Sequence, residues 1–237
     1  IMPSLVGSEM CIRDRFYISD RKNVPYGDKT QSFMLTQTRL MINELIKMNV
    51  EIVLLACNTL TVETIDIIRS EYNIPFVGIE PYIKFPAFHN NENSKIGMIL
   101  TPATYRSKRF HYLRDEFDKD HQVEIYPLSN LALYIEKLYS SENNKMEDLI
   151  KSELRQLAGK GIDHLILGCT HYPLISDLIE TELNVKTVDP HKNVIAQLQK
   201  IGEIDNEKVI EKIHLKENIT DDWVVKDISI TQIKSNI

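Results

Sequence analysis

The fold is decided by two stretches of the chain, Glu51-Ile-Val-Leu-Leu-Ala-Cys-Asn-Thr59 and Ile162-Asp-His-Leu-Ile-Leu-Gly-Cys-Thr-His171. In each, an apolar run with the character of a β-strand ends at a cysteine. Each run also follows a segment whose apolar residues recur at helical spacing, 31–48 for the first and 146–160 for the second. The same unit of helix, strand and cysteine therefore occurs twice.

Nearly continuous apolar strands are typical of parallel sheets that are buried on both faces. Short runs of the same kind predict further strands at 76–79, 95–100, 123–126 and 185–188, with helices at 60–72, 105–117 and 193–201 between them. We therefore expect an α/β protein with two similar halves, each a mostly parallel sheet flanked by helices, and an active site between them.

The predicted organisation has two domains and two terminal segments. The first domain combines 16–79 with 190–215, the second is 80–189, and 216–237 is a tail of unassigned role whose alternating residues 223–233 indicate a late edge strand or an ordered tail. Residues 1–15 start with Ile and lack the basic start and apolar stretch of a signal peptide. They resemble translated sequencing-adapter sequence, with a divergent terminus as the alternative, so we treat them as a non-native leader outside the fold prediction.

Composition excludes several classes of protein. Hydrophobic residues make up 43% and charged residues 26%, which is typical of a globule with a real core. The net charge of −6 gives no electrostatic footprint for nucleic acid, and the longest apolar run, 52–57, is far shorter than the roughly 20 residues that span a membrane. Three cysteines argue against a secreted disulfide scaffold, and no phosphate-binding glycine loop occurs. We expect a cytosolic protein that binds neither nucleic acid nor membranes.

The two cysteines mark the candidate site. Ligands of α/β sheets bind outside the carboxyl ends of the strands, and Cys57 and Cys169 both stand at that end. If the two halves face each other, the thiols flank one small molecule. The alternative is that each cysteine is a small buried hydrophobe, as free cysteines commonly are.

Several motifs resemble those of the glutamate racemase family, a branch of the aspartate/glutamate racemase superfamily. The two cysteine signatures are Leu55-Ala-Cys-Asn-Thr59 and Leu167-Gly-Cys-Thr-His-Tyr-Pro-Leu174. The other matching segments are Asp20 with Pro25-Tyr-Gly27, Gly78-Ile-Glu-Pro81, and Leu100-Thr-Pro-Ala-Thr-Tyr-Arg-Ser107. The resemblance extends from about Phe16 to about Ile201.

The resemblance implies interconversion of L-glutamate and D-glutamate by two thiols, without pyridoxal phosphate, another cofactor or a metal. One base must remove the weakly acidic α-proton while an acid on the opposite face replaces it, and a thiol can do this where its pKa is lowered or its proton is accepted. By resemblance, Cys57 acts on D-glutamate and Cys169 on L-glutamate. The family supplies D-glutamate for peptidoglycan in the bacterial cytoplasm, and it often forms homodimers.

The resemblance also assigns roles to other positions. It implies that His171 assists Cys169 in catalysis and that Asp20 orients or assists Cys57. It also implies that Glu136 is the acidic residue near Cys169. The substrate-binding residues that it implies are Tyr26, Gly27, Asn58, Thr59, Thr101, Thr104 and Thr170. The structural alternatives are strand-end caps and turns for the small polar residues, a surface-loop role for Asp20 and an exposed helix-end charge for Glu136.

One family feature has no counterpart in this sequence. The family begins with a strand that leads into an Asp-Ser-Gly-x-Gly-Gly loop, and no such loop precedes Asp20. If the 237 residues are the whole chain, we expect impaired folding and activity, which an authentic amino terminus should restore.

Three alternatives stay open. The first is a racemase of aspartate or another small amino acid, against which His171 and Tyr172 favour glutamate. The second is an inactive, truncated homologue that only binds ligand. The third is a metal-binding or thiol-redox protein, which is disfavoured because Cys169-x-His171 is too short for a usual zinc site and no CxxC occurs.

Overall fold

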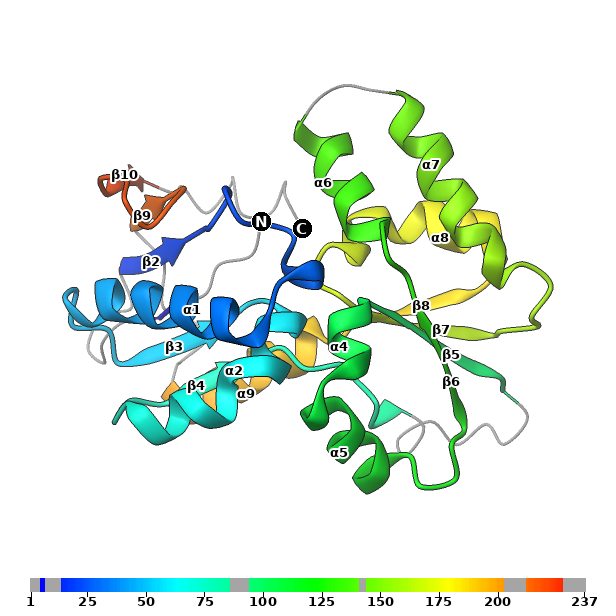
Figure 1. Ribbon diagram of the computed structural model, residues 1–237, viewed down its shortest axis with the longest axis horizontal. Helices are drawn as coiled ribbons and strands as arrows, with labels where there is room; N and C mark the ends of the chain where they lie inside the picture. Colours follow the sequence, from blue (N-terminus) through cyan, green and yellow to red (C-terminus); the bar gives the residue numbers. More distant parts are fainter. Residues whose placement is uncertain (1–4, 7–13, 86–93, 141–143, 203–211, 228–237) are drawn as a thin grey trace.

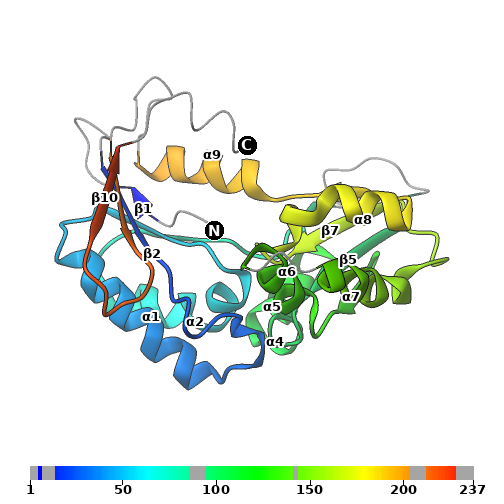
Figure 2. The same cartoon turned by 90° about the horizontal axis from the view of Figure 1, so that it is seen from above.

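The computed structural model describes residues 5–6, 14–85, 94–140, 144–202 and 212–227. Its strands form three sheets. Figures 1 and 2 show two lobes, with the described strands and helices of residues 94–188 in one lobe and those of residues 14–79 and 191–227 in the other. The predicted α/β class, with parallel sheets flanked by helices, is confirmed.

The sheet of the lobe of residues 94–188 is parallel throughout, in the order β6-β5-β7-β8. Its strands are β5 (Ile96–Leu100), β6 (Val123–Pro127), β7 (His164–Gly168) and β8 (Lys186–Val188). The accompanying helices are α4 (Pro102–Arg106), α5 (Lys108–Phe117), α6 (Leu131–Ser140), α7 (Asn144–Leu154) and α8 (Ser176–Leu183). All of β5 is buried, and so is β7 beyond its first residue, which explains why both strands are apolar runs without alternation.

The other lobe contains two three-stranded sheets. In one, β3 (Ile52–Leu55) pairs in parallel with β4 (Phe76–Gly78) and antiparallel with β1 (Leu5–Val6). In the second, β9 (Lys212–Lys216) pairs in parallel with β2 (Asp14–Ile18) and antiparallel with β10 (Val224–Asp227). The long helices of this lobe are α1 (Gln31–Ile46), α2 (Asn58–Glu71) and α9 (His191–Gly202).

Each lobe has its own core. Around β5–β8 the buried side chains include Ile99, Leu165 and Ile135, and around β3 they include Val53, Ile42 and Ile68. Helix α9 packs on the lobe that contains β3, because Leu198 lies in a buried cluster with Ile52 of β3 and Val77 of β4. The chain thus leaves one lobe after β4 and returns to it at α9, while the predicted domain division stays a prediction.

Two predicted helices differ in detail from those observed. The helix expected over 105–117 is interrupted at Ser107, whose hydroxyl accepts a hydrogen bond from the Phe110 N–H and so starts α5. The helix expected over 146–160 ends at Leu154 and continues as a 3-10 turn. Gly159 and Gly161 follow at φ +71° and +70°, a backbone conformation that favours glycine.

Strands also occur in the terminal segments that the sequence left outside the domains. Leu5–Val6 of the leader forms β1, and Asp14 begins β2. Within the tail, the predicted edge strand begins at Val224 as β10, and residues 228–233 of that prediction lie outside the described residues. The strand pairing of β2 with β9 was not predicted, because it joins segments from opposite ends of the chain.

Candidate active site

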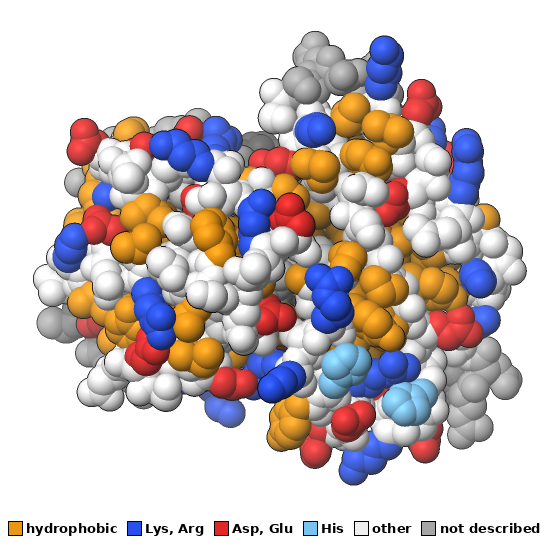
Figure 3. Space-filling view, viewed as in Figure 1, with side chains coloured by type: hydrophobic (Ala, Val, Ile, Leu, Met, Phe, Trp, Pro, Cys, Tyr) orange, Lys and Arg blue, Asp and Glu red, His pale blue; other side chains and the backbone are white. Residues whose placement is uncertain are grey.

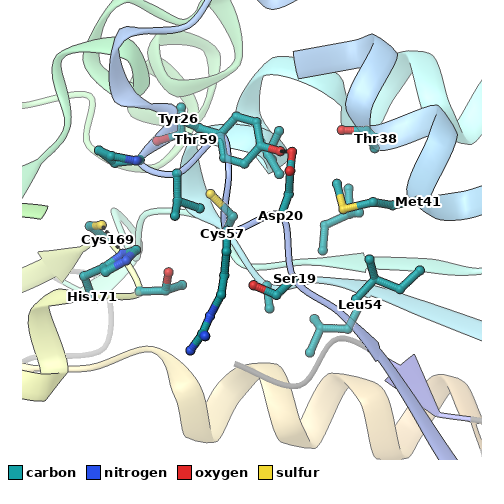
Figure 4. Close-up of a pocket in the computed structure, with 18 of the residues that line it drawn as sticks. Ser19, Asp20, Tyr26, Thr38, Met41, Leu54, Cys57, Thr59, Cys169 and His171 are labelled. Atoms are coloured by element: carbon teal, nitrogen blue, oxygen red, sulfur yellow. Dashed lines mark hydrogen bonds between the residues drawn. The ribbon is translucent and has the colours of Figure 1, made fainter. Parts of the chain in front are cut away.

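A pocket lies where the two lobes meet, at the carboxyl ends of β2, β3 and β7 (Figure 4). Most of the predicted site residues line it: Asp20, Tyr26, Gly27, Cys57, Thr59, Thr101, Glu136, Cys169, Thr170 and His171. Asn58 and Thr104 do not line it, and both are buried, at 2% and 0% exposure. The topology therefore brings both cysteines to one pocket.

Cys57 lies at the junction of β3 and α2, in the N-cap position of the helix. Burial, with a smaller contribution from the nearby Cys169, raises the pKa of the Cys57 thiol to about 12. The backbone N–H groups of Leu60 and Thr59, in the first turn of α2, oppose this increase. Without a ligand, Cys57 is thus a protonated thiol, suited to giving a proton.

Cys169 has a different environment, because a histidine and a carboxylate stand in line behind it. The Cys169 Sγ is 3.8 Å from Nδ1 of His171, and Nε2 of His171 is 2.9 Å from Oε2 of Glu136. Burial opposes a charge on His171, but the contacts with Cys169 and Glu136 outweigh it and raise the pKa of His171 to about 10. The hydrogen bond from His171 in turn lowers the pKa of Glu136. The chain of three groups can accept or return a proton at the thiol.

Asp20 anchors the loop that covers the pocket on the Cys57 side. Its carboxylate accepts hydrogen bonds from the Tyr26 hydroxyl and from Nδ2 of Asn23, the latter at 2.8 and 2.9 Å to its two oxygens. Burial and this contact with Asp20 raise the pKa of Tyr26. Among the described residues, no hydrogen bond joins Asp20 to Cys57, so its predicted part in catalysis stays a prediction.

Three threonine hydroxyls connect the lobes beside Cys57. Thr59 of α2 lies 2.9 Å from the Thr101 hydroxyl and 3.1 Å from that of Thr104, and the latter two are 2.9 Å apart. Thr101 also caps α4 through the N–H of Thr104. Next to them, the buried Asn58 amide has no hydrogen-bond partner on either its oxygen or its nitrogen within the described structure.

The sequence did not identify two further parts of the lining. One is an apolar wall from α1 and β3, and the other is a short polar stretch that continues from β2. The wall consists of Met41, Ile42, Leu45, Val53 and Leu54. The helical spacing of α1 predicted that its apolar face is buried, but not which residues of that face reach the pocket. The polar stretch includes Arg21, a cation that no sequence pattern singles out.

The described residues were also compared with the requirements for metal binding, membrane insertion and nucleic-acid binding. No group of three or more His, Cys, Asp and Glu side chains there could hold a metal ion. None of the helices described is long and apolar enough to cross a membrane. On the face drawn in Figure 3, basic and acidic side chains are interspersed over the part of the surface that is described, rather than gathered in a basic stripe.

Known proteins match most of the chain. The Asp/Glu/Hydantoin racemase family matches residues 16–198. A glutamate racemase of Leptospira interrogans is 34% identical over 183 residues, which are 77% of this chain and 70% of that protein. A glutamate racemase of Clostridium botulinum is also 34% identical, over 69% of this chain, and the match spans 63% of the relative's length, less than two thirds.

Solved structures agree with the sequence comparison. The glutamate racemase isoform RacE1 of Bacillus anthracis has a TM-score of 0.69 at 26% identity, with 84% of this chain and 77% of that chain covered. The glutamate racemase of Francisella tularensis, solved in complex with D-glutamate, has a TM-score of 0.64 at 27% identity and covers 85% of this chain and 78% of its own. From the matched segment, the two cysteine motifs and the shared architecture, we conclude that the chain belongs to the Asp/Glu/Hydantoin racemase family.

Proposed function

We propose that this protein interconverts L-glutamate and D-glutamate by acid/base catalysis with two thiols. The observation that carries the proposal is that Cys57 and Cys169, from different sheets, line one pocket. A racemase needs a base and an acid on opposite faces of the α-carbon, and a pocket with a thiol from each lobe supplies such a pair. The glutamate racemases among its relatives support glutamate as the substrate.

In the proposed reaction, one thiolate removes the α-proton and the other thiol delivers a proton from the opposite face. Starting from L-glutamate, Cys169 is the base, and the Cys57 thiol, which burial keeps protonated, is the acid. The C–H bond on one face breaks, its electron pair stays on the α-carbon, and a new C–H bond forms on the other face with the Cys57 proton. From D-glutamate the roles are exchanged, so after each turnover the two sulfurs have changed protonation state.

The residues around the thiols have separate parts in this proposal. His171, held by Glu136, exchanges a proton with Cys169 and provides a positive charge beside it. The first-turn N–H groups of Thr59 and Leu60 stabilise the Cys57 thiolate that forms when this thiol gives up its proton. Tyr26, Gly27, Thr59, Thr101 and Thr170 contact the substrate, while Asn58 and Thr104 shape the wall from behind. D-glutamate would then supply peptidoglycan synthesis in the bacterial cytoplasm.

The test is proton NMR of L-glutamate with the purified protein in D₂O, with L-aspartate in a parallel sample. We expect the α-proton signal of glutamate to disappear while the circular dichroism of the solution falls to zero, and the aspartate signal to persist. Faster exchange of aspartate than of glutamate would show that aspartate is the substrate. Binding of glutamate without exchange would make this chain a binding homologue, and retained exchange after Cys57→Ala combined with Cys169→Ala would overturn the two-thiol mechanism.

A further inference from the structure

Arg21 lines the pocket, and the proposed reaction assigns no role to its positive charge. The charged groups of the lining are Asp20, Arg21, Glu136 and His171. Asp20 is occupied by Asn23 and Tyr26, and Glu136 and His171 are paired with each other. Within the described lining, Arg21 is therefore the cation left to meet an anionic ligand.

The partner of Arg21 lies outside the pocket and holds it weakly. Its Nη1 donates to Oε2 of Glu217 at 3.1 Å, and the two side chains are 52% and 67% exposed. Exposed ion pairs of this kind contribute little, because water screens them and two long side chains lose freedom. A carboxylate of a bound ligand can replace Glu217 at small cost.

The backbone of Arg21 is fixed, in contrast to its side chain. The Arg21 N–H donates to the Glu217 carbonyl at 3.3 Å, and the neighbouring residues repeat the pattern: Ser19 donates to the Lys216 carbonyl at 2.9 Å and Lys22 to Asn218 Oδ1 at 3.2 Å. The end of β9 thus holds the segment after β2. The guanidinium can change partner without moving its Cα.

The position of Arg21 indicates which part of a ligand it meets. The α-carbon of the substrate must reach both thiols, and Cys169 is 8% exposed and so lies in the interior. The half-exposed guanidinium, bonded to a residue that does not line the pocket, lies at the mouth. The charge of Arg21 also acts on a group inside the pocket. The hydrogen bond from His171 lowers the pKa of Glu136 most, and the charge of Arg21 makes a smaller contribution in the same direction.

We propose that Arg21 binds the side-chain carboxylate of glutamate, exchanging Glu217 for the substrate, and thereby selects an acidic amino acid over its amide. The inference rests on the proposed function for the identity of the ligand. The guanidinium fork suits a carboxylate with two parallel hydrogen bonds, whereas the amide of glutamine can accept at one atom only. Arg21 is thus a specificity-determining residue at the mouth, separate from the two thiols.

The test compares the dissociation constants of DL-glutamate and DL-glutamine, measured by saturation-transfer NMR, which requires no turnover. We expect the protein to bind glutamate about 10-fold to 100-fold more tightly than glutamine. Arg21→Gln should reduce this ratio to near one, and Arg21→Lys, which keeps the charge but not the fork, should leave an intermediate ratio. Arg39→Gln is the matched control, because Arg39 forms an exposed ion pair with Glu71 away from the pocket and should not alter the ratio.

Each outcome is decisive. A preference for glutamate that Arg21→Gln leaves unchanged would overturn the proposal, and so would the absence of any preference in the unaltered protein. Glu217→Gln should preserve the ratio or increase it, since it frees Arg21 for the ligand. If the protein binds glutamate through Arg21 but shows no α-proton exchange, the proposed function fails while the role of Arg21 stands.

Discussion

The two cysteines follow similar strands in the sequence, yet their surroundings differ. Cys57 lies at the start of a helix, where burial raises its pKa to about 12. Cys169 has the His171–Glu136 pair behind it, with a histidine whose pKa is raised to about 10. Burial and backbone N–H groups determine the pKa of Cys57, whereas a histidine and a carboxylate stand in line behind Cys169. Equivalent places in two lobes therefore hold thiols whose surroundings are different, although in the proposed reaction each thiol acts as acid in one direction and as base in the other.

The largest effect is expected when one thiol at a time is removed. We expect Cys57→Ala and Cys169→Ala each to lower the rate of racemisation by about 100-fold to 10,000-fold, since general acid or base catalysis on one face is lost. Polarimetry in both directions measures the effect. Cys11→Ala, at the remaining cysteine, is the control and should leave the rate unchanged.

The raised pKa of Cys57 can be tested by alkylation. Because only the thiolate reacts, and burial raises the Cys57 pKa to about 12, alkylation of Cys57 by iodoacetamide should accelerate about tenfold per pH unit, or about 100-fold from pH 8 to pH 10. Mass spectrometry of the Cys57 peptide follows the reaction without interference from the other cysteines. A rate that levels off below pH 8 would show that Cys57 is already a thiolate and would remove the asymmetry.

Glu136→Gln tests the contribution of the Glu136 carboxylate on the Cys169 side of the pocket. Glu136 supports the protonated form of His171, so the variant should lower the pKa of His171 below about 10 and move the alkaline limb of the pH–rate profile to lower pH. The rate from L-glutamate should fall by about 10-fold to 100-fold, less than on loss of the thiol, because Glu136 acts through His171. Glu71→Gln, in an exposed ion pair, provides the control. An unshifted profile would contradict the relay.

The smallest effect concerns the threonine cluster beside Cys57. Thr104→Val keeps the shape of the buried side chain but removes one hydroxyl, while Thr59 and Thr101 can still bond to each other at 2.9 Å. We expect a loss of about 1 kcal/mol in the free energy of unfolding, measured in urea, and little change in rate. Thr36→Val on the exposed face of α1 should change stability by less than about 0.5 kcal/mol. Equal losses of unfolding free energy in the two variants would show that the threonine cluster contributes no more to stability than an exposed threonine.

Local patterns in the sequence predicted the parts of the site that depend on single elements. Apolar runs located β3 and β7, and their ends located Cys57 and Cys169. His171 follows its thiol by two residues, so its proximity is local, while Glu136 depends on the family resemblance for its assignment.

Other features depend on contacts across the chain and leave no periodic signal. The pairing of β2 with β9 joins residues almost 200 apart, and it fixes the segment that carries Arg21. The hydrogen bond between Tyr26 and Asp20 joins residues that are close in the sequence. It nevertheless depends on the shape of the loop between them, which the residue types do not determine. Local periodicity therefore predicts the strands and the thiols, whereas the mouth of the pocket requires the structure.

In the proposed mechanism each thiol serves one face of the α-carbon, so the two single-thiol variants should differ in which enantiomer of glutamate they exchange. Each enantiomer of glutamate is incubated in D₂O with Cys57→Ala and, separately, with Cys169→Ala, and its α-proton is followed by NMR. We predict that Cys57→Ala still exchanges L-glutamate but not D-glutamate, and that Cys169→Ala shows the reverse. Exchange of both enantiomers by either variant would contradict the account, because one thiol would then serve both faces.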